Sequence, residues 1–139
     1  MPSIEADVEW QGRTIRIMAT HPLPPMNDRY YRARNLQLEL LAKRVQTYRK
    51  DEPENSVIVV GDLNLAPWSP LFHDFLAASS LQNASLGRGL TPTWYRWNYF
   101  PFGLVLDHGF STDDLVCADR QVLGDVGSDH RPVVFRFEE

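Results

Sequence analysis

The fold of this chain follows from one stretch, Val57-Ile58-Val59-Val60-Gly61-Asp62-Leu63-Asn64. Its first four residues are apolar and β-branched, which is typical of a buried strand. Gly61 then allows the backbone to turn sharply where the strand ends. Asp62 and Asn64 follow, so a carboxylate and an amide are presented from a rigid strand end. One interpretation is phosphate-ester chemistry, in which the carboxylate binds a metal or orients a water and the amide bonds a phosphoryl oxygen. The other is an Asx turn, in which the two side chains only cap backbone groups.

The sequence on both sides of this strand predicts one α/β (α+β) domain, with an antiparallel or mixed sheet and helices on one face. Polar and apolar residues alternate near the N-terminus, which indicates a hairpin. Cap residues precede two segments of helical spacing: Asn27 and Asp28 before the first, Ser69 and Pro70 at the second. The elements are expected at residues 5–10 and 13–20 (hairpin), 29–50 and 70–79 (helices), and 114–123 and 133–137 (strands).

The long helix is expected to bury an apolar face and to expose its basic residues. The apolar face is predicted to comprise Ala33, Leu36, Leu40, Leu41, Val45 and Tyr48. The basic residues are expected to form a solvated face, with a nucleic-acid role as the alternative; they are Arg29, Arg32, Arg34, Lys43, Arg44, Arg49 and Lys50.

Composition limits the classes of function. The 139 residues are 43% hydrophobic and 23% charged, as in a globular domain. The net charge of −4 argues against a large footprint on duplex nucleic acid but leaves small phosphoesters open. Cys117 is the single cysteine and is expected to be buried in a strand, so no intrachain disulfide is possible and the compartment stays open, with the cytoplasm slightly favoured. No apolar run approaches the ~20 residues of a membrane helix.

An aromatic segment spans residues 91–102 and includes Trp94, Tyr95, Trp97 and Tyr99. Aromatic faces can stack on bases or pack against lipids, so the segment is either a substrate wall or a small satellite core. A core role is favoured for Trp94, and the roles of the other three residues stay open.

Polar residues recur at the ends of the predicted strands. If these strands are neighbours in one sheet, their side chains converge on one edge. Carboxylates that orient water, a histidine paired with a carboxylate and a hard divalent cation suit metal-assisted hydrolysis of phosphate esters. The residues in question are His21, Asp62, Asn64, Asp107, Asp129 and His130.

Four motifs together resemble the endonuclease/exonuclease/phosphatase superfamily, which is deoxyribonuclease I-like. They occur in the order of that family, and the Gly-Asp-x-Asn and Ser-Asp-His elements make a fairly specific pair. Thr93-Trp94 fits a threonine-tryptophan element of the same family. The motifs are Thr20-His21-Pro22, Gly61-Asp62-Leu63-Asn64, Leu106-Asp107-His108 and Gly127-Ser128-Asp129-His130-Arg131-Pro132.

The resemblance implies a role for each matching residue. Asp62 would orient or activate the attacking water, and Asn64 would help to hold the water and the phosphate. His21 would contact a phosphate oxygen or the leaving-group side. The implied substrate is a phosphate ester, either nucleic acid or a small or lipid phosphoester.

The remaining motif residues carry further implied roles. Asp107 would hydrogen-bond His130, which would face the phosphoryl group. Asp129 would approach the divalent metal, Mg²⁺ or Mn²⁺. His108, which follows Asp107 directly, is expected to be structural.

The resemblance covers only the C-terminal half of the family's fold. Nothing before His21 matches the earlier motifs, which supply an Asn and the principal metal-ligand Glu. Residues 1–139 would therefore be a single partial domain, one half of a four-layer α/β/β/α sandwich. A sheet without its partner sheet exposes an apolar face. We therefore expect a homodimer or another association through that face, and little or no activity of the chain alone.

Two competing hypotheses stay open for this chain. It could be a non-catalytic binding module that retains the fold. It could also be an unrelated α/β domain whose motifs match by chance, which would be excluded if the structure brought Asp62, Asp107, Asp129 and His130 together.

Overall fold

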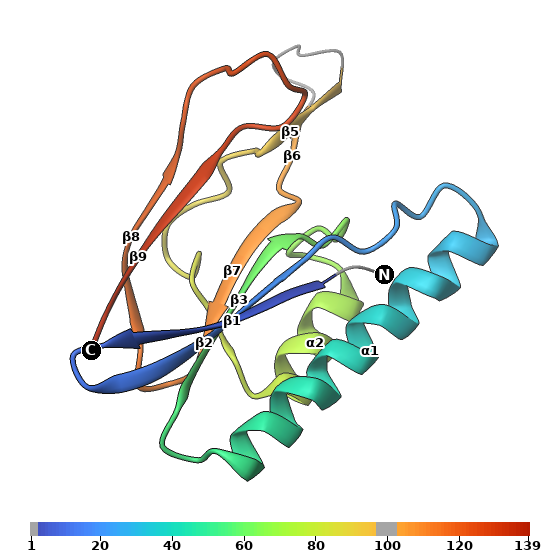
Figure 1. Cartoon of the computed structure of the whole chain (residues 1–139). Coiled ribbons are helices and arrows are strands. Elements are labelled where there is room, and N and C mark those ends of the chain that lie inside the picture. The colour runs from blue at the N-terminus through green and yellow to red at the C-terminus, as the bar shows by residue number, and fades with distance from the viewer. Residues whose placement is uncertain (1–2, 97–102) are drawn as a thin grey trace.

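The computed structural model describes residues 3–96 and 103–139 and shows a mixed sheet with two helices on one face (Figure 1). None of the helices in these ranges is long and apolar enough to cross a membrane. In chain order the elements are β1 (Ser3–Trp10), β2 (Arg13–Thr20), α1 (Asp28–Asp51), β3 (Ser56–Asp62), α2 (Pro70–Ser79), β4 (Gln82–Asn83), β5 (Trp94–Tyr95), β6 (Gly103–Leu104), β7 (Asp107–Ser111), β8 (Val116–Val122) and β9 (Val133–Glu138).

The main sheet has the strand order β1-β2-β3-β7-β4. Strands β2 and β3 are parallel and are joined through α1, whereas the other neighbours are antiparallel. The register of β3 and β7 places Asp62 directly opposite Asp107. Two smaller sheets, β5-β6 and β8-β9, complete the described part of the chain.

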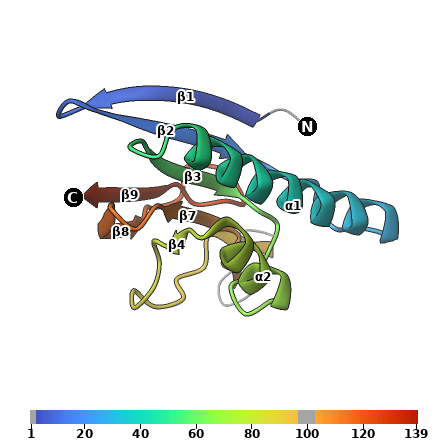
Figure 2. The same ribbon diagram turned by 90° about the horizontal axis from the view of Figure 1, so that it is seen from below.

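One face of the main sheet is closed by the helices, and we call it the closed face (Figure 2). Val57 and Val59 of β3 and Phe110 of β7 point to this face and have no exposed surface. They pack against side chains of both helices in one continuous core. The helix residues in this core are Leu38, Ala42, Val45, Phe72 and Phe75.

The opposite face, which we call the open face, is only partly covered by the β8–β9 hairpin (Figure 1). Because side chains alternate along a strand, Ile58 and Val60 point to this face. Phe135 of β9 packs on Gly109 of β7 so closely that a Cβ at Gly109 would lie 3.0 Å from its ring. A groove of about 750 Å³ stays open beside the hairpin.

The structure confirms the predicted hairpin, both helices and the two C-terminal strands to within a few residues. Asn27 caps α1 by accepting a hydrogen bond from the Tyr30 amide, and Cys117 is buried in β8. The apolar run at residues 104–106 lies before the central strand β7, which begins at Asp107. Strand β7 pairs with β3 although its Asp-His-Gly-Phe-Ser sequence has little intrinsic strand preference.

The predicted buried face of α1 is right only in part. Val45 is buried, and Leu41 and Tyr48 pack against the core, but Leu36 and Leu40 are each 54% exposed. The fully buried residues form a stripe rotated from the expected one. The helix carries two adjacent apolar stripes, and only its packing against β3 and α2 determines which is buried. The buried stripe comprises Arg34, Leu38, Ala42 and Val45.

Candidate active site

The predicted polar residues lie where three neighbouring strands meet at one edge of the open face. His21 follows the end of β2, Asp62 ends β3 and Asp107 begins β7. Since β2 runs parallel to β3 and β7 runs antiparallel to it, these three positions fall at the same edge of the sheet.

Gly61 brings the ends of β2 and β3 close together. Its φ of +145° lies in a region that L residues rarely adopt. A Cβ at this position would lie 1.9 Å from the carbonyl oxygen of Thr20. Only glycine fits here, and the close approach places His21 beside Asp62.

His130 reaches the same place from the loop before β9. The loop is held to β5, because the Tyr95 amide donates to the Asp129 carbonyl (2.8 Å) and the Arg131 amide donates to the Thr93 carbonyl (2.7 Å). The Nδ1 atom of His130 then lies 2.9 Å from Oδ2 of Asp107. Asp107 thus orients the imidazole.

Asp62 lies between the two histidines. Its Oδ2 is 3.3 Å from Nε2 of His21 and 3.6 Å from Nε2 of His130. Its Oδ1 accepts a hydrogen bond of 2.7 Å from the Asn64 amide. Burial raises the pKa of the Asp62 carboxyl above its ordinary value; the Asn64 hydrogen bond and the two histidines oppose the shift, whereas Asp107 adds to it. A carboxylate with a raised pKa is a stronger base for a water proton.

Asn64 is fixed from several directions. Its φ of +48° is left-handed, a conformation that Asn tolerates better than most residues. Its Nδ2 donates to the Pro22 carbonyl (2.9 Å), which ties the loop after His21 to the loop after Asp62. One proton of the amide group stays available for another acceptor.

Asp129 lies beside these residues without joining their contacts. Its Oδ2 accepts a hydrogen bond of 2.9 Å from Nε1 of Trp94, and this bond lowers the pKa of the Asp129 carboxyl. The core role expected for Trp94 is therefore wrong: its indole is half-buried and orients Asp129. Trp97 and Tyr99 lie outside the described residues.

The described residues do not by themselves form a metal centre. Nowhere in residues 3–96 and 103–139 do three His, Cys, Asp or Glu side chains come together in a metal-binding arrangement. Asp62 and Asp107 face histidines, and Asp129 stands apart from them.

His108 follows Asp107 but points to the closed face. It is 1% exposed, its ring packs near Phe72 and Phe110, and its Nε2 lies 2.7 Å from the Leu65 carbonyl. Burial lowers the pKa of His108 to about 4. The ring is therefore neutral near pH 7, and its position in the core agrees with the structural role expected for it.

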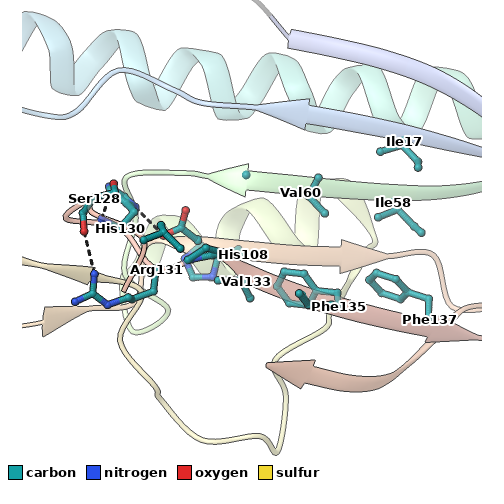
Figure 3. Close-up of a pocket in the computed structure, with 15 residues that line it drawn as sticks. Ile17, Ile58, Val60, His108, Ser128, His130, Arg131, Val133, Phe135 and Phe137 are labelled. Atoms are coloured by element: carbon teal, nitrogen blue, oxygen red, sulfur yellow. Dashed lines mark hydrogen bonds and ion pairs between the residues drawn. The ribbon is translucent and has the colours of Figure 1, made fainter. Parts of the chain in front are cut away.

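The open groove runs from these polar residues along the open face of the main sheet. Figure 3 shows Ile17, Ile58 and Val60 on one side of it and Phe135 and Phe137 on the other. Ser128, His130 and Arg131 lie at one end of the groove. The apolar part of the groove and the polar constellation are thus continuous.

Sequence reasoning missed Arg34, which it placed on a solvated face. Arg34 is buried, and its Nη1 donates to the Asn64 carbonyl at 2.5 Å. The spacing of Arg34, Leu38 and Ala42 places them on one helical stripe, which is a signal for the burial of Arg34 but not for its contact with Asn64.

The comparisons with known proteins agree with this geometry. The model of the Endonuclease/Exonuclease/phosphatase family matches residues 1–130, so the chain belongs to that family. No curated protein matches the chain. Family membership, with Asp62, Asp107 and His130 in contact and Asp129 adjacent in sequence, excludes the chance match of an unrelated domain.

Several solved structures share the fold at low sequence identity. A Danio rerio TDP2 complexed with a single-strand DNA product has a TM-score of 0.76 at 18% identity, over 97% of this chain and 60% of that one. The human Nocturnin catalytic domain with bound sulfate has a TM-score of 0.74 at 20% identity, over 98% of this chain and 51% of that one. A doubly substituted Staphylococcus aureus β toxin with bound magnesium ions has a TM-score of 0.65 at 19% identity, over 94% and 52%. The chain thus spans roughly half to three fifths of these structures.

Proposed function

We propose that this chain carries the water-activating and phosphate-facing side of a metal-dependent phosphoesterase site. The observation that carries the proposal is the position of Asp62, 3.3 Å from His21 and 3.6 Å from a His130 that is paired with Asp107. Family membership supports hydrolysis of phosphate esters as the reaction class. Phosphodiesters and phosphomonoesters both fit this chemistry.

The proposed reaction begins at Asp62. Its Oδ2 accepts a proton from a water molecule, and the water oxygen forms a bond to phosphorus. The bond between phosphorus and the leaving oxygen breaks, and that oxygen takes a proton from His21 or from solvent. Asn64 holds the loop that follows Asp62, the proposed base, and offers a proton of its side-chain amide to a phosphoryl oxygen.

His130 has the second role in the proposal. With Nδ1 bonded to Asp107, its Nε2 is directed toward the space between His130 and Asp62. A protonated imidazole there would stabilise the negative charge that develops on the phosphoryl oxygens. Asp107 keeps the ring in this orientation.

A divalent cation, Mg²⁺ or Mn²⁺, is proposed as the cofactor, with Asp129 as the one ligand from this chain. When bound, such a cation neutralises charge on the phosphoryl group. The principal carboxylate ligand is proposed to lie outside this chain, in an N-terminal half of a longer protein.

The substrate is proposed to be nucleic acid or a small or lipid phosphoester. The TDP2 complex with single-strand DNA product supports nucleic acid. The net charge of −4 favours a small phosphoester over a long duplex. A non-catalytic binding module is the second candidate, and the observation in its favour is that the described residues hold no cluster of three metal-ligating side chains. Calorimetric titration with Mn²⁺ of the longest natural form of the protein distinguishes the two, because a module would not bind the ion.

The open groove is the proposed surface of association. Its apolar lining, which includes Ile58, Phe135 and Phe137, is accessible in the described structure. We propose that a second copy of the chain, or the N-terminal half of a longer protein, covers it.

Turnover of bis(4-nitrophenyl) phosphate with Mg²⁺ or Mn²⁺ tests the function. We expect little turnover by the isolated chain and clear turnover by the longest natural form. Asp62→Asn should lower the turnover by a factor of about 100 or more. The matched control is Asp113→Asn, because Asp113 is an exposed carboxylate that pairs only loosely with Arg49 (3.3 Å). Equal turnover in Asp62→Asn and the wild type would contradict the proposal.

A further inference from the structure

Arg34 is a buried cation on the helix beside the candidate site. It is 5% exposed, although the other arginines of the first turns of α1, Arg29 and Arg32, are exposed. Its Nη1 donates to the Asn64 carbonyl (2.5 Å) and its Nε donates to Oδ1 of Asn35 (2.8 Å). Its guanidinium carbon also lies 5.3 Å from the centre of the Tyr31 ring.

No carboxylate pairs with Arg34 among residues 3–96 and 103–139. Burial of a charge is unfavourable unless an opposite charge compensates it, and an apolar side chain of similar size is often equally stable or more stable. Burial accordingly lowers the pKa of the Arg34 guanidinium, although an arginine stays protonated in proteins. The charge of Arg34 therefore gives the fold little stability that an apolar side chain of similar size would not give.

The partner of Arg34 gives a reason. Asn64 has a left-handed backbone conformation (φ +48°), and three contacts hold the residue in it. Its backbone amide donates a hydrogen bond to Asp62, and its side-chain amide donates one to the Pro22 carbonyl. Its own carbonyl accepts a hydrogen bond from Arg34. Arg34 supplies the one of these three contacts that comes from a helix.

We propose that Arg34 is a positioning residue, which holds the Asn64 carbonyl and thereby keeps the Asp62 carboxylate directed between His21 and His130. The chain of contacts is direct: Arg34 fixes Asn64, and the Asn64 amide fixes Oδ1 of Asp62. With Oδ1 fixed, Oδ2 faces the two histidines. The role in turnover rests on the proposed phosphoesterase function, whereas the role in loop geometry does not.

The test compares Arg34→Met, which removes the charge and the donors at similar length, with Arg34→Lys, which retains a charge and one compact donor group. Arg32→Met is the matched control, because Arg32 is an exposed arginine on the same turn of α1. Three quantities are measured for each: the Tm, the hydrogen-exchange rate of the Asn64 amide by NMR, and kcat and KM for bis(4-nitrophenyl) phosphate in the longest natural form.

For Arg34→Met we expect an unchanged or higher Tm and at least tenfold faster exchange of the Asn64 amide, with no change at Val59. We expect kcat to fall about 10- to 100-fold with little change in KM, since small displacements of a reacting group have effects of this size. Arg34→Lys should lie between Arg34→Met and the wild type, and Arg32→Met should match the wild type.

A lower Tm or an unfolded Arg34→Met variant would show a purely structural role and overturn the proposal. Unchanged exchange at Asn64 would overturn it as well, and so would an unchanged kcat in a form that turns over. If no form of the protein hydrolyses the substrate, the proposed function fails, and the Tm and the exchange rate at Asn64 still decide whether Arg34 positions this loop.

Discussion

The two faces of the main sheet differ in what covers them, and this difference separates structural residues from candidate catalytic ones. On the closed face Val57 and Val59 are fully buried under the helices. On the open face Ile58 and Val60 border a groove that leads to Asp62. Neighbouring residues of one strand thus serve a core on one side and a site on the other.

Two histidines show the same contrast. His108 lies on the closed face, is neutral near pH 7 and bonds a backbone carbonyl. His130 lies on the open face, is partly exposed and pairs with Asp107. Both lie next to an aspartate in the sequence, so the motif alone does not separate them. Burial and the chemistry of the partner do.

The largest expected effect comes from truncating one aromatic residue on each face. Phe110→Ala on the closed face should lower the free energy of unfolding by about 3–5 kcal/mol, because it leaves a cavity in a closed core. Phe135→Ala on the open face should cost about 1–2 kcal/mol, because its ring is only partly buried. Urea unfolding of both variants measures the difference. Equal losses would show that the open face is as tightly packed as the closed one.

The next effect concerns the acid sensitivity of the closed face. The pKa of His108 is about 4 in the folded chain, below its ordinary value of 6.5, so protonation favours unfolding. The contribution of neutral His108 to the free energy of unfolding is complete above pH 6.5. It falls by about 3 kcal/mol as the pH falls toward 4. His108→Gln should therefore lose less stability than the wild type between pH 7 and 4. Urea unfolding at several pH values measures the free energy of unfolding of both proteins. An equal loss between pH 7 and 4 in both would refute this role of His108.

On the open face, the pKa shift of Asp62 makes stability depend on pH in the opposite direction. Its folded pKa is raised, so its ionised form is disfavoured in the native state, and stability falls as the pH rises above the ordinary range of an aspartate. Asp62→Asn should raise the Tm at pH 7 and should give no gain near pH 3, although it should abolish turnover. Calorimetry at the two pH values measures this. A lower Tm at pH 7 would mean that Asp62 stabilises the fold rather than serves the site.

The smallest effect is on association through the groove. Light scattering after size exclusion should show concentration-dependent dimers of the isolated chain, and Phe137→Lys should reduce them because it places a charge in the groove. Val116→Lys is the control, since Val116 is exposed on β8 and does not line the groove. A monomer at all concentrations would contradict the proposal that a second copy covers the face.

The sequence was sufficient to predict the elements around β3, because strand runs, caps and turns are local signals. It also predicted that His21, Asp62, Asp107 and His130 meet, since strand ends carry them in a family-like order, but it placed Asp129 with them, and that side chain stands apart. It did not predict the strand at Asp107, whose residues have weak strand preference and are held by pairing with β3. It also misassigned Trp94, whose indole bonds Asp129.

Arg34 illustrates a different limit. Helical spacing offers several stripes of residues, and the stripe that is buried depends on how α1 lies against the sheet and α2. An arginine counts against burial in any such pattern, so its contact with Asn64 became evident only from the assembled fold.

The central claim is that the open face binds a phosphoryl group at His130, and titration of the isolated chain with inorganic phosphate tests it most directly. The imidazole resonances of all four histidines would be followed by NMR at constant pH. We expect phosphate to shift the resonances of His130 and His21 and to leave those of His108 unchanged. Equal shifts of His108 and His130, or no shift of His130 at any phosphate concentration, would contradict the claim.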